Sequence, residues 1–468
     1  MNANASSKAH GGDQAEKSMA WGPQTELARH HFAVSNEKMP EGVLRALAIL
    51  KRVCAQVNAE SGAIDQAVSE AIQHACNEVL SGQHDHAFPL VIWQSGSGTQ
   101  TNMNMNEVLA RLASRHLPHS NTPWRQVHPN DEVNRSQSTN DIFPSALQVA
   151  AAMAVTHDLL PALSRLRTAI HAIATKGRGI EKVGRTHLQD AVMMTVEQEW
   201  MAFDAQIEQA AISIERAREP VLALPVGGTA VGTGLNAPEG FGRKVCLNLS
   251  QLLGLPFVEA ENKFAAIAAH DALVGLHGAL KQLAVALMKL ANDTRWLGSG
   301  PRCGLGELTL PANEPGSSIM PGKVNPTQCE MLVMVCVQVM ANDVSMSWCG
   351  ASGNFQLNTF KPLMAHTLLQ SLRLLVDAVG SFTKHGLQGM QIHEQKLAWY
   401  RSRSLMGITA LTPEIGYDRA AKISRKAYEE DLSLADAAAK LGEEPELVQR
   451  LQREIGTAFA EGMRSPHT

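Results

Sequence analysis

Apolar residues recur at alternating steps of three and four along three stretches of the chain. The clearest stretch, in an alanine-rich background, has Leu273, Leu276, Leu280, Leu283, Leu287 and Leu290. The others have Leu163, Leu166, Ile170 and Ile173, and Leu368, Leu372, Leu375 and Val379. Such spacing puts one apolar seam on each helix and favours packing at a small crossing angle. The pattern therefore predicts three long helices that pack through these seams.

A further apolar run, from Met331 to Met340, is interrupted only by Gln338. Its alternating valines are compatible with a buried strand. Pro326 at a plausible first helical position, and an unbroken pattern as far as Val344, favour a helix that is buried on all sides. Such a helix needs neighbours all round it, so the run also indicates an oligomer whose cores merge.

Changes in this pattern divide the chain into four parts. Residues 1–18 are polar, and we expect them to be disordered. We expect residues 19–140 to form an N-terminal domain and residues 141–395 a central helical bundle. Residues 396–468, in which the apolar segments are shorter, are expected to form a small helical C-terminal domain.

Composition narrows the class of protein. Of the 468 residues 44% are hydrophobic, enough for a large core, and the net charge of -4 excludes a nucleic-acid-binding protein with a basic surface. No stretch of 18 or more consecutive apolar residues occurs, so we expect no membrane span. The first twenty residues lack the pattern of a signal or transit peptide, which predicts a cytoplasmic protein. The seven cysteines include no C-x-x-C pair, which argues against a structural zinc site.

Four polar, glycine-rich segments interrupt the apolar helices. The first, Gly96–Glu107, contains Ser97, Gly98 and Thr99. Glycine allows the backbone N–H groups to approach a ligand closely, and the hydroxyls add neutral hydrogen bonds. A helix start with Thr or Asn as its N-cap explains the segment equally well. A phosphate-binding P-loop is excluded because no Gly-Lys-Ser/Thr sequence follows.

The second segment, His128–Asp141, leads into a long helix through Ser138, Thr139 and Asn140. These three residues predict a helix cap, with Asp141 in the first turn. They also predict an anion site built from hydroxyls, an amide and a helix N-terminus. The two interpretations are compatible because the same backbone N–H groups serve both.

The third segment, Gly184–Ala191, surrounds His187 with Arg185, Thr186 and Asp190 just before another helix. A single histidine is more often structural than catalytic, but this polar setting leaves both roles open. A separate glycine-rich stretch, Gly227–Gly234, superficially resembles a dinucleotide fingerprint. Its spacing is wrong and we expect no βαβ unit around it, so a nucleotide site is not predicted.

The fourth segment, Glu314–Glu330, is the most specific. Two Pro-Gly pairs bracket two serines and give a loop with defined bends. Lys323 is its only cation, Asn325 follows, and Glu330 lies on the next helix. A surface loop has no need of that mixture beside a fully apolar helix, so the segment predicts a functional site.

Residues Gly316–Pro326, read as GSSxMPGKxNP, resemble the signature of the fumarase/aspartase superfamily. The resemblance continues through WQSGSGTQTNMNMNE, HPNDEVNRSQSTND, ENKFAAIAAHDAL and GASGNFQLNTFKP, and covers roughly residues 20–460. Three details are similar to class II fumarases. They are His187 where aspartases have Gln, Gly322 where aspartases have Ala, and the His128–Asp131 segment with Arg125 before it. The segment Ala191–Glu199 departs from the usual fumarase sequence, which puts the packing of a helix near His187 in doubt.

The resemblance implies a role for each candidate residue. Ser317 would abstract a proton from C3 of malate, while Lys323, Asn325 and the loop N–H groups would stabilise the aci-carboxylate intermediate. His187, held by Glu330, would protonate the departing hydroxyl or act through a water molecule. The remaining substrate-binding residues would be Ser97, Gly98, Thr99, Ser138, Thr139, Asn140, Thr186 and Ser318. A secondary anion site would comprise Arg125, His128, Pro129, Asn130 and Asp131.

The resemblance also implies an all-α fold with a long central helix bundle, and a homotetramer whose subunits share their active sites. It implies reversible hydration of fumarate to L-malate, with no metal or organic cofactor and no nucleic-acid or membrane partner. An aspartate ammonia-lyase, or another lyase that releases fumarate, is the main alternative. A non-catalytic scaffold predicts the loss of Ser317, Lys323 or His187, and all three are present.

Overall fold

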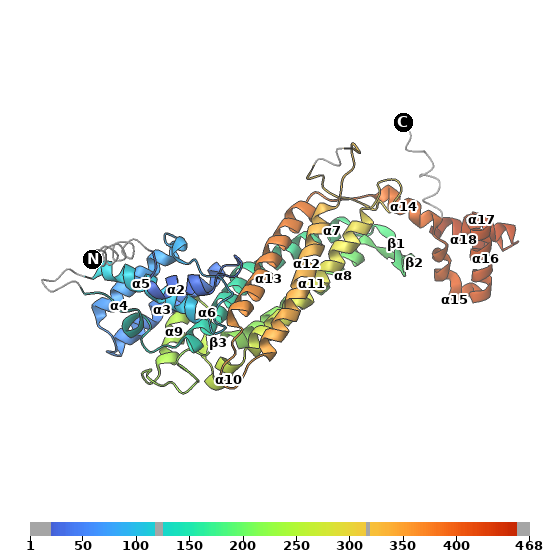
Figure 1. Cartoon of the computed structure of the whole chain (residues 1–468). Helices are drawn as coiled ribbons and strands as arrows, with labels where there is room; N and C mark the ends of the chain where they lie inside the picture. The colour runs from blue at the N-terminus through green and yellow to red at the C-terminus, as the bar shows by residue number, and fades with distance from the viewer. Residues whose placement is uncertain (1–19, 118–124, 315–318, 456–468) are drawn as a thin grey trace. The chain divides into compact units, whose positions relative to one another are not determined.

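The computed structural model describes residues 20–117, 125–314 and 319–455 (Figure 1). This part of the chain is mainly helical, which confirms the expected all-α fold. The helices are α2 (Pro23–His31), α3 (Glu41–Glu60), α4 (Gln66–Leu80), α5 (Thr99–His116), α6 (Thr139–Met153), α7 (Leu160–Lys176), α8 (Val196–Arg218), α9 (Phe241–Leu253), α10 (Lys263–Ala268), α11 (Asp271–Leu297), α12 (Thr327–Ala351), α13 (Lys361–Ser381), α14 (Glu394–Arg403), α15 (Thr412–Ile415), α16 (Tyr417–Glu429), α17 (Leu434–Lys440) and α18 (Pro445–Ile455).

The strands of the described residues form three two-stranded pairs. They are β1 (Glu181–Thr186) with β2 (Gln189–Thr195), β3 (Ala223–Leu224) with β4 (Val258–Glu259), and β5 (Leu308–Thr309) with β6 (Gln391–Ile392). The first and third pairs are antiparallel and the second is parallel. None of these pairs forms a layer of the fold, so the core is built by helices.

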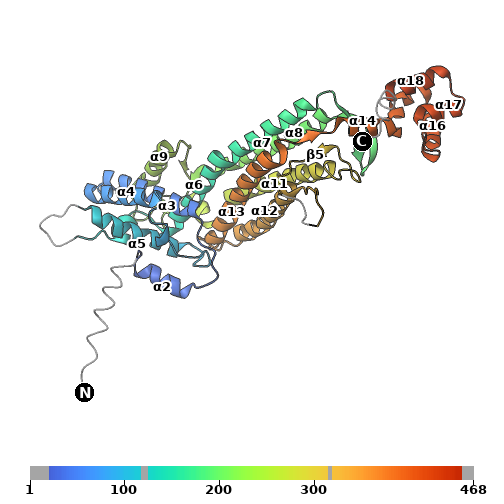
Figure 2. The same ribbon diagram turned by 90° about the horizontal axis from the view of Figure 1, so that it is seen from above.

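The three helices predicted from apolar spacing are present as α7, α11 and α13. Their seam residues are buried; Leu276, Leu280 and Leu372, for example, are at most 1% exposed. Helices α11, α12 and α13 lie side by side (Figures 1 and 2). His277 of α11 bonds to Asp343 of α12 and to Ser371 of α13, at 3.1 and 2.9 Å. This buried polar contact fixes the register of the three helices where leucine packing alone would leave it free to slip.

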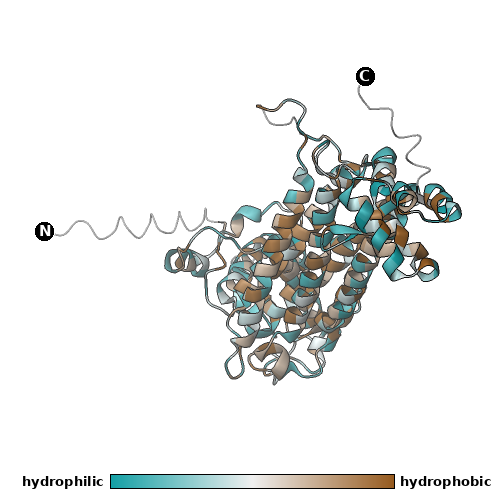
Figure 3. Cartoon of the chain, turned by 90° about the vertical axis from the view of Figure 1, so that its right-hand side faces the viewer, coloured by the Kyte–Doolittle hydropathy of each residue, from teal (hydrophilic) through white to brown (hydrophobic). Residues whose placement is uncertain are grey.

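The apolar run Met331–Met340 lies in α12, so the strand interpretation is wrong. The expectation that neighbouring chains bury this helix on all sides stays a prediction, because the structure describes a single chain. Val337 and Val344 are 55% and 60% exposed, and Trp348 is 72% exposed. Brown, apolar residues are visible on the long helices in Figure 3. Among the described residues of one chain, α12 therefore keeps an apolar face that no other element covers.

Among the residues that the structure describes, three helical stretches are long and apolar enough to cross a membrane by length and composition alone. They are Thr139–Lys176, Asp271–Leu297 and Thr327–Ala351. The sequence criterion of an unbroken apolar run missed them because polar residues interrupt each one. The most apolar part of the first two is 61% and 56% buried, but that of the third is only 33% buried. Core packing therefore accounts for much of the apolar character of the first two stretches.

The chain divides into two compact units. Unit 1 contains residues 1–161, 210–284 and 337–376, and unit 2 contains residues 162–209, 285–336 and 377–468. In unit 1, α3 packs against α4, α6 and α9. In unit 2, β1 packs against α14, and the short helices near the C-terminus enclose a core of their own that includes Ile408, Ile423, Leu434 and Leu451.

Candidate functional site

The first polar segment forms a tight loop at the start of α5. Gly98 is the N-cap residue, so the alternative of a Thr or Asn cap is wrong. Its φ of 82° lies in the left-handed region, and a Cβ there would come within 2.5 Å of the Phe143 ring, so glycine is required on both counts. The Ser97 hydroxyl lies 2.7 Å from that of Thr99 and 3.0 Å from that of Ser95. The loop thus holds a row of hydroxyls beside the helix N-terminus.

The second segment caps α6, as the sequence predicts. The Ser138 hydroxyl accepts a hydrogen bond from the backbone N–H of Asn140 at 3.2 Å. In return, the Ser138 N–H donates to Oδ1 of Asp141 at 2.9 Å, which completes a capping box. Thr139 is the first residue of the helix, and Ser138, Thr139 and Asn140 are all half-buried.

Asp141 also anchors a distant segment. Its side chain is fully buried, and Oδ2 accepts hydrogen bonds from the backbone N–H groups of Gly227 and Thr229 at 3.0 and 2.9 Å. Burial raises the pKa of Asp141 to about 6, although the backbone donors oppose this shift. The Asn140 amide donates to the carbonyl oxygen of Ala230 at 2.8 Å. The residues around Thr229 are therefore fastened to the N-terminus of α6.

This arrangement decides the role of the glycine-rich stretch Gly227–Gly234. Contrary to the sequence expectation, a minimal βαβ unit does surround it, because β3 and β4 pair in parallel on either side of α9. The glycines do not open that helix, which begins only at Phe241. Two backbone N–H groups that a phosphate would need already donate to Asp141. The stretch therefore supports the N-terminus of α6.

A direct hydrogen bond brings the first two segments together within unit 1. The Asn102 amide nitrogen on α5 donates to the Thr139 hydroxyl at 3.0 Å. The hydroxyl row at Ser97 and Thr99 thus belongs to the same small region as Ser138, Thr139 and Asn140. Hydroxyls, an amide and two helix N-termini at one place suit the binding of an anion such as a carboxylate.

His187 lies at the tip of a β-hairpin, which the sequence did not predict. Strands β1 and β2 pair up to Thr186 and Gln189, and His187 and Leu188 form the turn between them. Both turn residues have positive φ, 55° and 60°, as a two-residue hairpin turn demands, although residues other than glycine and asparagine rarely adopt it. The expected helix after His187 is wrong, because residues 189–195 form a strand and α8 begins at Val196. Thr186 and His187 are exposed.

A buried charge network supports this hairpin. Lys182 of β1 is 2% exposed and pairs with Glu199 and Glu307, each at 2.7 Å. Arg185, two residues before His187, reaches the other oxygen of Glu307 at 2.6 Å, and its guanidinium also lies over the Tyr400 ring. Burial raises the pKa of Glu199, while the charge of Lys182 acts in the opposite direction. Because both cations lie on β1, the network fixes the strand that carries His187.

The fourth segment is only partly described. Ser317 and Ser318, the residues predicted to abstract the proton and bind substrate, lie outside the described residues. Lys323, Asn325 and Glu330 are exposed, the last of them on the first turn of α12. Among the described residues, none of His187, Lys323 and Glu330 is hydrogen-bonded to another of the three. Their assembly into one site remains a prediction.

The segment predicted to bind a second anion is occupied by carboxylates of the chain itself. The Arg125 guanidinium pairs with Asp65 at 2.9 Å and with Glu132 at 2.5 Å. Glu132 also accepts the backbone N–H of His128 at 2.8 Å, and His128 pairs with Asp131. Pro129 and Asn130 begin the short helical turn that follows. An external anion would have to compete with Glu132 for both donors.

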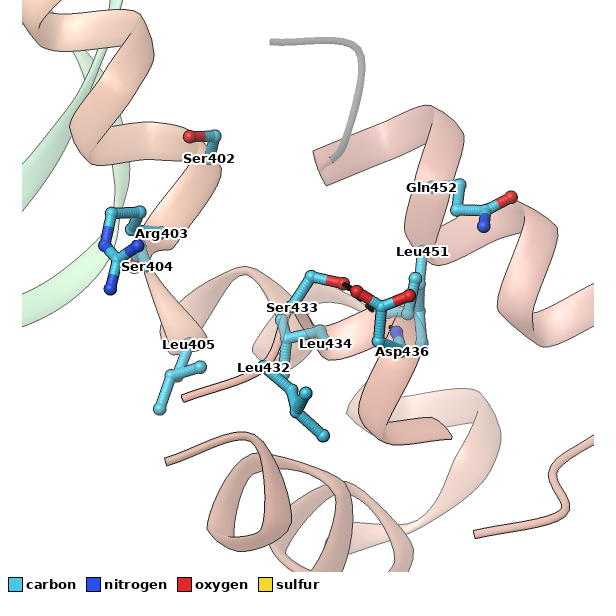
Figure 4. Close-up of a pocket in the computed structure, with 11 residues that line it drawn as sticks. Ser402, Arg403, Ser404, Leu405, Leu432, Ser433, Leu434, Asp436, Leu451 and Gln452 are labelled. Carbon is cyan, nitrogen blue, oxygen red and sulfur yellow. Dashed lines mark hydrogen bonds between the residues drawn. The ribbon is translucent and has the colours of Figure 1, made fainter. Parts of the chain in front are cut away.

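A small pocket lies among the C-terminal helices, lined by residues that include Ser402, Ser433, Asp436 and Leu451 (Figure 4). The Ser433 hydroxyl donates to the Asp436 carboxylate at 2.7 Å and accepts the Asp436 N–H at 3.1 Å. These bonds are the N-terminal cap of α17. Ser433 and Asp436 are thereby accounted for by helix capping, and none of the predicted site residues lines the pocket.

Sequence analysis did not single out the fully buried Lys51, which lies close to the predicted site. The Lys51 ammonium on α3 donates to Oδ1 of Asn134 at 2.7 Å. A signal was present, because Lys51 lies on the apolar face of its helix, between Leu47 and Cys54. A charged residue on an apolar face is uncommon without a partner.

Comparisons with known proteins agree with the resemblance. Residues 12–341 match the family described as Lyase, and residues 408–452 match the family described as Fumarase C C-terminus. The chain is 54% identical over 422 residues to a class II fumarate hydratase of Myxococcus xanthus, covering 90% of this chain and 91% of that protein. A class II fumarate hydratase of Thermosynechococcus vestitus is also 54% identical, covering 90% of each chain.

Solved structures show the same fold. The class II fumarase from Schistosoma mansoni superposes with a TM-score of 0.90 and 43% identity, covering 96% of this chain and 97% of that one. A protein described as fumarate lyase:delta crystallin, from Brucella melitensis, superposes with a TM-score of 0.88 and 36% identity, covering 94% and 96%. With this likeness over nearly its whole length, the chain belongs to the lyase family and, within it, to the class II fumarate hydratases.

Proposed function

We propose that this chain catalyses the reversible hydration of fumarate to L-malate. The observation that carries the proposal is the 54% identity to class II fumarate hydratases over 90% of the chain. Ser317, Lys323 and His187 are all present, which argues against a non-catalytic scaffold. His187 and Gly322 favour this activity over that of an aspartate ammonia-lyase.

The substrate is a dicarboxylate, and the N-terminus of α6 is suited to one of its carboxylates. The Thr139 hydroxyl accepts from Asn102 and the Ser138 hydroxyl accepts from the backbone of Asn140. Because each oxygen is already an acceptor, each hydroxyl proton is left to donate to a ligand. Ser97, Gly98 and Thr99 complete this part of the binding site in our proposal.

The remaining groups would carry out the proton transfers. Removal of the C3 proton of malate, by Ser317, places further negative charge on a carboxylate that is already anionic. Lys323 and Asn325 would stabilise that aci-carboxylate through a cation and an amide donor. His187, paired with Glu330, would protonate the departing hydroxyl, and Thr186 and Ser318 would hold the substrate. The strained turn at His187 fits this role because functional residues often occupy unfavourable backbone conformations.

No metal or organic cofactor enters this proposal. Among the described residues, no group of three or more His, Cys, Asp and Glu side chains is placed to hold a metal ion. The charge that develops in the reaction is instead met by fixed donors of the protein. We therefore expect turnover to persist in the presence of EDTA.

We further propose a homotetramer with shared active sites, free in the cytoplasm. Its support is the apolar face of α12, where Met334, Val337 and Trp348 are more than half exposed in the single chain. Copies of the same helix would cover this face and exclude water from it. Gln338, which is also exposed on this helix, argues against a lipid environment.

The domain division stays a proposal of the same kind. Residues 396–468 would form a small helical domain, which the separate core around Ile408, Ile423 and Leu451 supports. Residues 19–140 would form the N-terminal domain and residues 141–395 the central bundle.

The activity is tested by following the ultraviolet absorbance of fumarate as it appears from L-malate. Parallel reactions with L-aspartate test the ammonia-lyase alternative. We expect fumarate to form from L-malate and not from L-aspartate. Turnover of L-aspartate alone would replace the proposed function, and turnover of neither substrate would favour the scaffold.

A further inference from the structure

Lys51 is a buried cation behind the proposed carboxylate site. Its side chain on α3 has no exposed surface, and burial lowers its pKa to about 7. An apolar side chain would suit this core position better, because a buried charge must give up its hydration. Its one described side-chain hydrogen bond runs to Oδ1 of Asn134 at 2.7 Å.

A chain of hydrogen bonds leads from Lys51 to Thr139. Oδ1 of Asn134 accepts from Lys51 and also from the Asn102 amide nitrogen, the latter at 3.2 Å. The second hydrogen of the same Asn102 amide lies toward the Thr139 hydroxyl, 3.0 Å away. The other end of the Asn134 amide donates to the carbonyl oxygen of Gln137 at 3.3 Å. All these residues belong to unit 1.

Lys51 at one end of the Asn134 amide and the Gln137 carbonyl at the other together set the direction of the bonds in this chain. The protonated Lys51 has donors and no acceptor, and the Gln137 carbonyl oxygen can only accept, so Asn134 turns its oxygen toward Lys51 and its NH2 group toward Gln137. That oxygen can then only accept from Asn102, which must present its NH2 group. The NH2 group donates to Thr139, whose hydroxyl oxygen is thereby an acceptor. The Thr139 proton is left to point elsewhere.

A buried oxygen without a hydrogen-bond partner in the described part of the chain supports this orientation of the Asn102 amide. Oδ1 of Asn102 is buried and has no hydrogen-bond partner among the described residues. Turning the amide over would allow that oxygen to accept the Thr139 proton. It would also set the oxygen against Oδ1 of Asn134, which Lys51 holds in place. The amide therefore keeps the orientation that frees the Thr139 proton.

We propose that Lys51 is a positioning residue that makes the Thr139 hydroxyl a hydrogen-bond donor to the substrate carboxylate. It acts through Asn134 and Asn102 and does not touch the substrate. The inference rests on the proposed function, because it assigns the carboxylate of L-malate or fumarate as the acceptor. It adds to that function a buried residue that sets the affinity of the site.

The test is a double-mutant cycle on KM for L-malate. Lys51→Met removes the ammonium at similar volume, and Thr139→Val removes the hydroxyl. We expect Lys51→Met to raise KM about tenfold with little change in kcat, because a bond to a charged group is lost equally in ground and transition states. In the Thr139→Val background the same change should leave KM unaltered. Additive effects would overturn the inference.

Asn58→Leu is the matched control for a purely structural role. Asn58 lies on the same helix, is equally buried, and holds the segment next to Asn134 through Arg135 and Ser136, at 2.9 and 2.7 Å. It is not part of the chain that leads to Thr139. We expect this variant to be less stable but to keep a KM within about twofold of the wild type. A rise in KM equal to that of Lys51→Met would overturn the inference.

A second variant covers the case in which Lys51→Met does not fold, as judged by circular dichroism. Asn134→Leu breaks the same chain one step later and should raise KM by a similar factor, again without effect in the Thr139→Val background. The wild type is assayed first. Absence of L-malate turnover there would overturn the proposed function and the inference together, whereas turnover with additive effects would overturn the inference alone.

Discussion

Oδ2 of Asp141 accepts a hydrogen bond from the backbone N–H of Thr229 at 2.9 Å, and this contact joins two segments that lie 88 residues apart in sequence. Oδ1 of the same carboxylate closes the capping box with Ser138. One buried side chain thus fixes both the start of α6 and the neighbouring loop. The proposed carboxylate site depends on the N-terminus of α6, because it includes the N-cap residue Ser138 and the first helical residue Thr139.

Asp141→Asn is expected to destabilise the protein. The Asp141 carboxylate accepts three backbone N–H groups, those of Ser138, Gly227 and Thr229, on its two oxygens. An amide has only one oxygen, so at least one of these donors would lose its acceptor. Leaving a buried donor unpaired costs about 2 kcal/mol, so urea unfolding should show a loss of at least that size. The exposed Asp158 provides the control, since Asp158→Asn should change little. Equal stability of Asp141→Asn and the wild type would contradict the anchoring role.

His187→Asn is expected to lower turnover of L-malate by roughly two to four powers of ten, the usual range for a positioned acid or base. His128→Asn should have a much smaller effect, because His128 belongs to the proposed secondary site. The measurement is kcat for each purified variant. Equal losses of kcat in the two variants would refute our separation of the two sites.

Glu132→Gln is expected to strengthen anion binding at Arg125. Glu132 now pairs with Arg125 and accepts the His128 N–H, so it competes with any external anion. An exposed ion pair contributes at most about 1 kcal/mol, which limits the gain in affinity to roughly fivefold. Titration with inorganic phosphate at low ionic strength would measure the change. Weaker phosphate binding in the variant would show that Glu132 supports the site.

Mixed oligomers test whether active sites are shared. His187→Asn and Ser317→Ala should each be inactive when refolded alone. Unfolded together and refolded, they should regain about a quarter of wild-type activity if each site takes His187 and Ser317 from different chains, because each good residue is supplied with a probability of about one half. Confirmed mixed tetramers without any recovery would place both residues in one chain.

The stability contributed by Lys361 is expected to depend on pH. Burial lowers its pKa from the ordinary value of 10.5 to about 7. Between these two pH values the unfolded chain holds a proton that the folded chain has released, so stability rises with pH across that window. Lys361→Met removes this contribution. The Tm of the wild type relative to the variant should therefore increase between about pH 7 and 10, and a constant difference would contradict the assignment.

Much of the architecture could be predicted from local patterns. The leucine spacing predicted α7, α11 and α13 because helix periodicity is a property of neighbouring residues. The cap of α6 was predictable for the same reason, since Ser138 and Asp141 lie within one turn. The hairpin at His187 was not, because its turn uses residues that seldom adopt positive φ. The pairing with β2 and the charges around Lys182 stabilise that turn.

The sequence by itself therefore determined the long helices, the family and the set of candidate residues, all of which are recorded in short segments of the chain. Only the tertiary structure decided how Asp141 is shared and that the Thr139 hydroxyl accepts a hydrogen bond from Asn102. Lys51 and Asn134 are 83 residues apart, and their hydrogen bond forms only after α3 packs in the core. The local sequence pattern shows that Lys51 lies on an apolar helix face, which is unusual for a lysine. It does not show the partner of Lys51, because Lys51 and Asn134 approach each other only in the folded chain, where water is excluded.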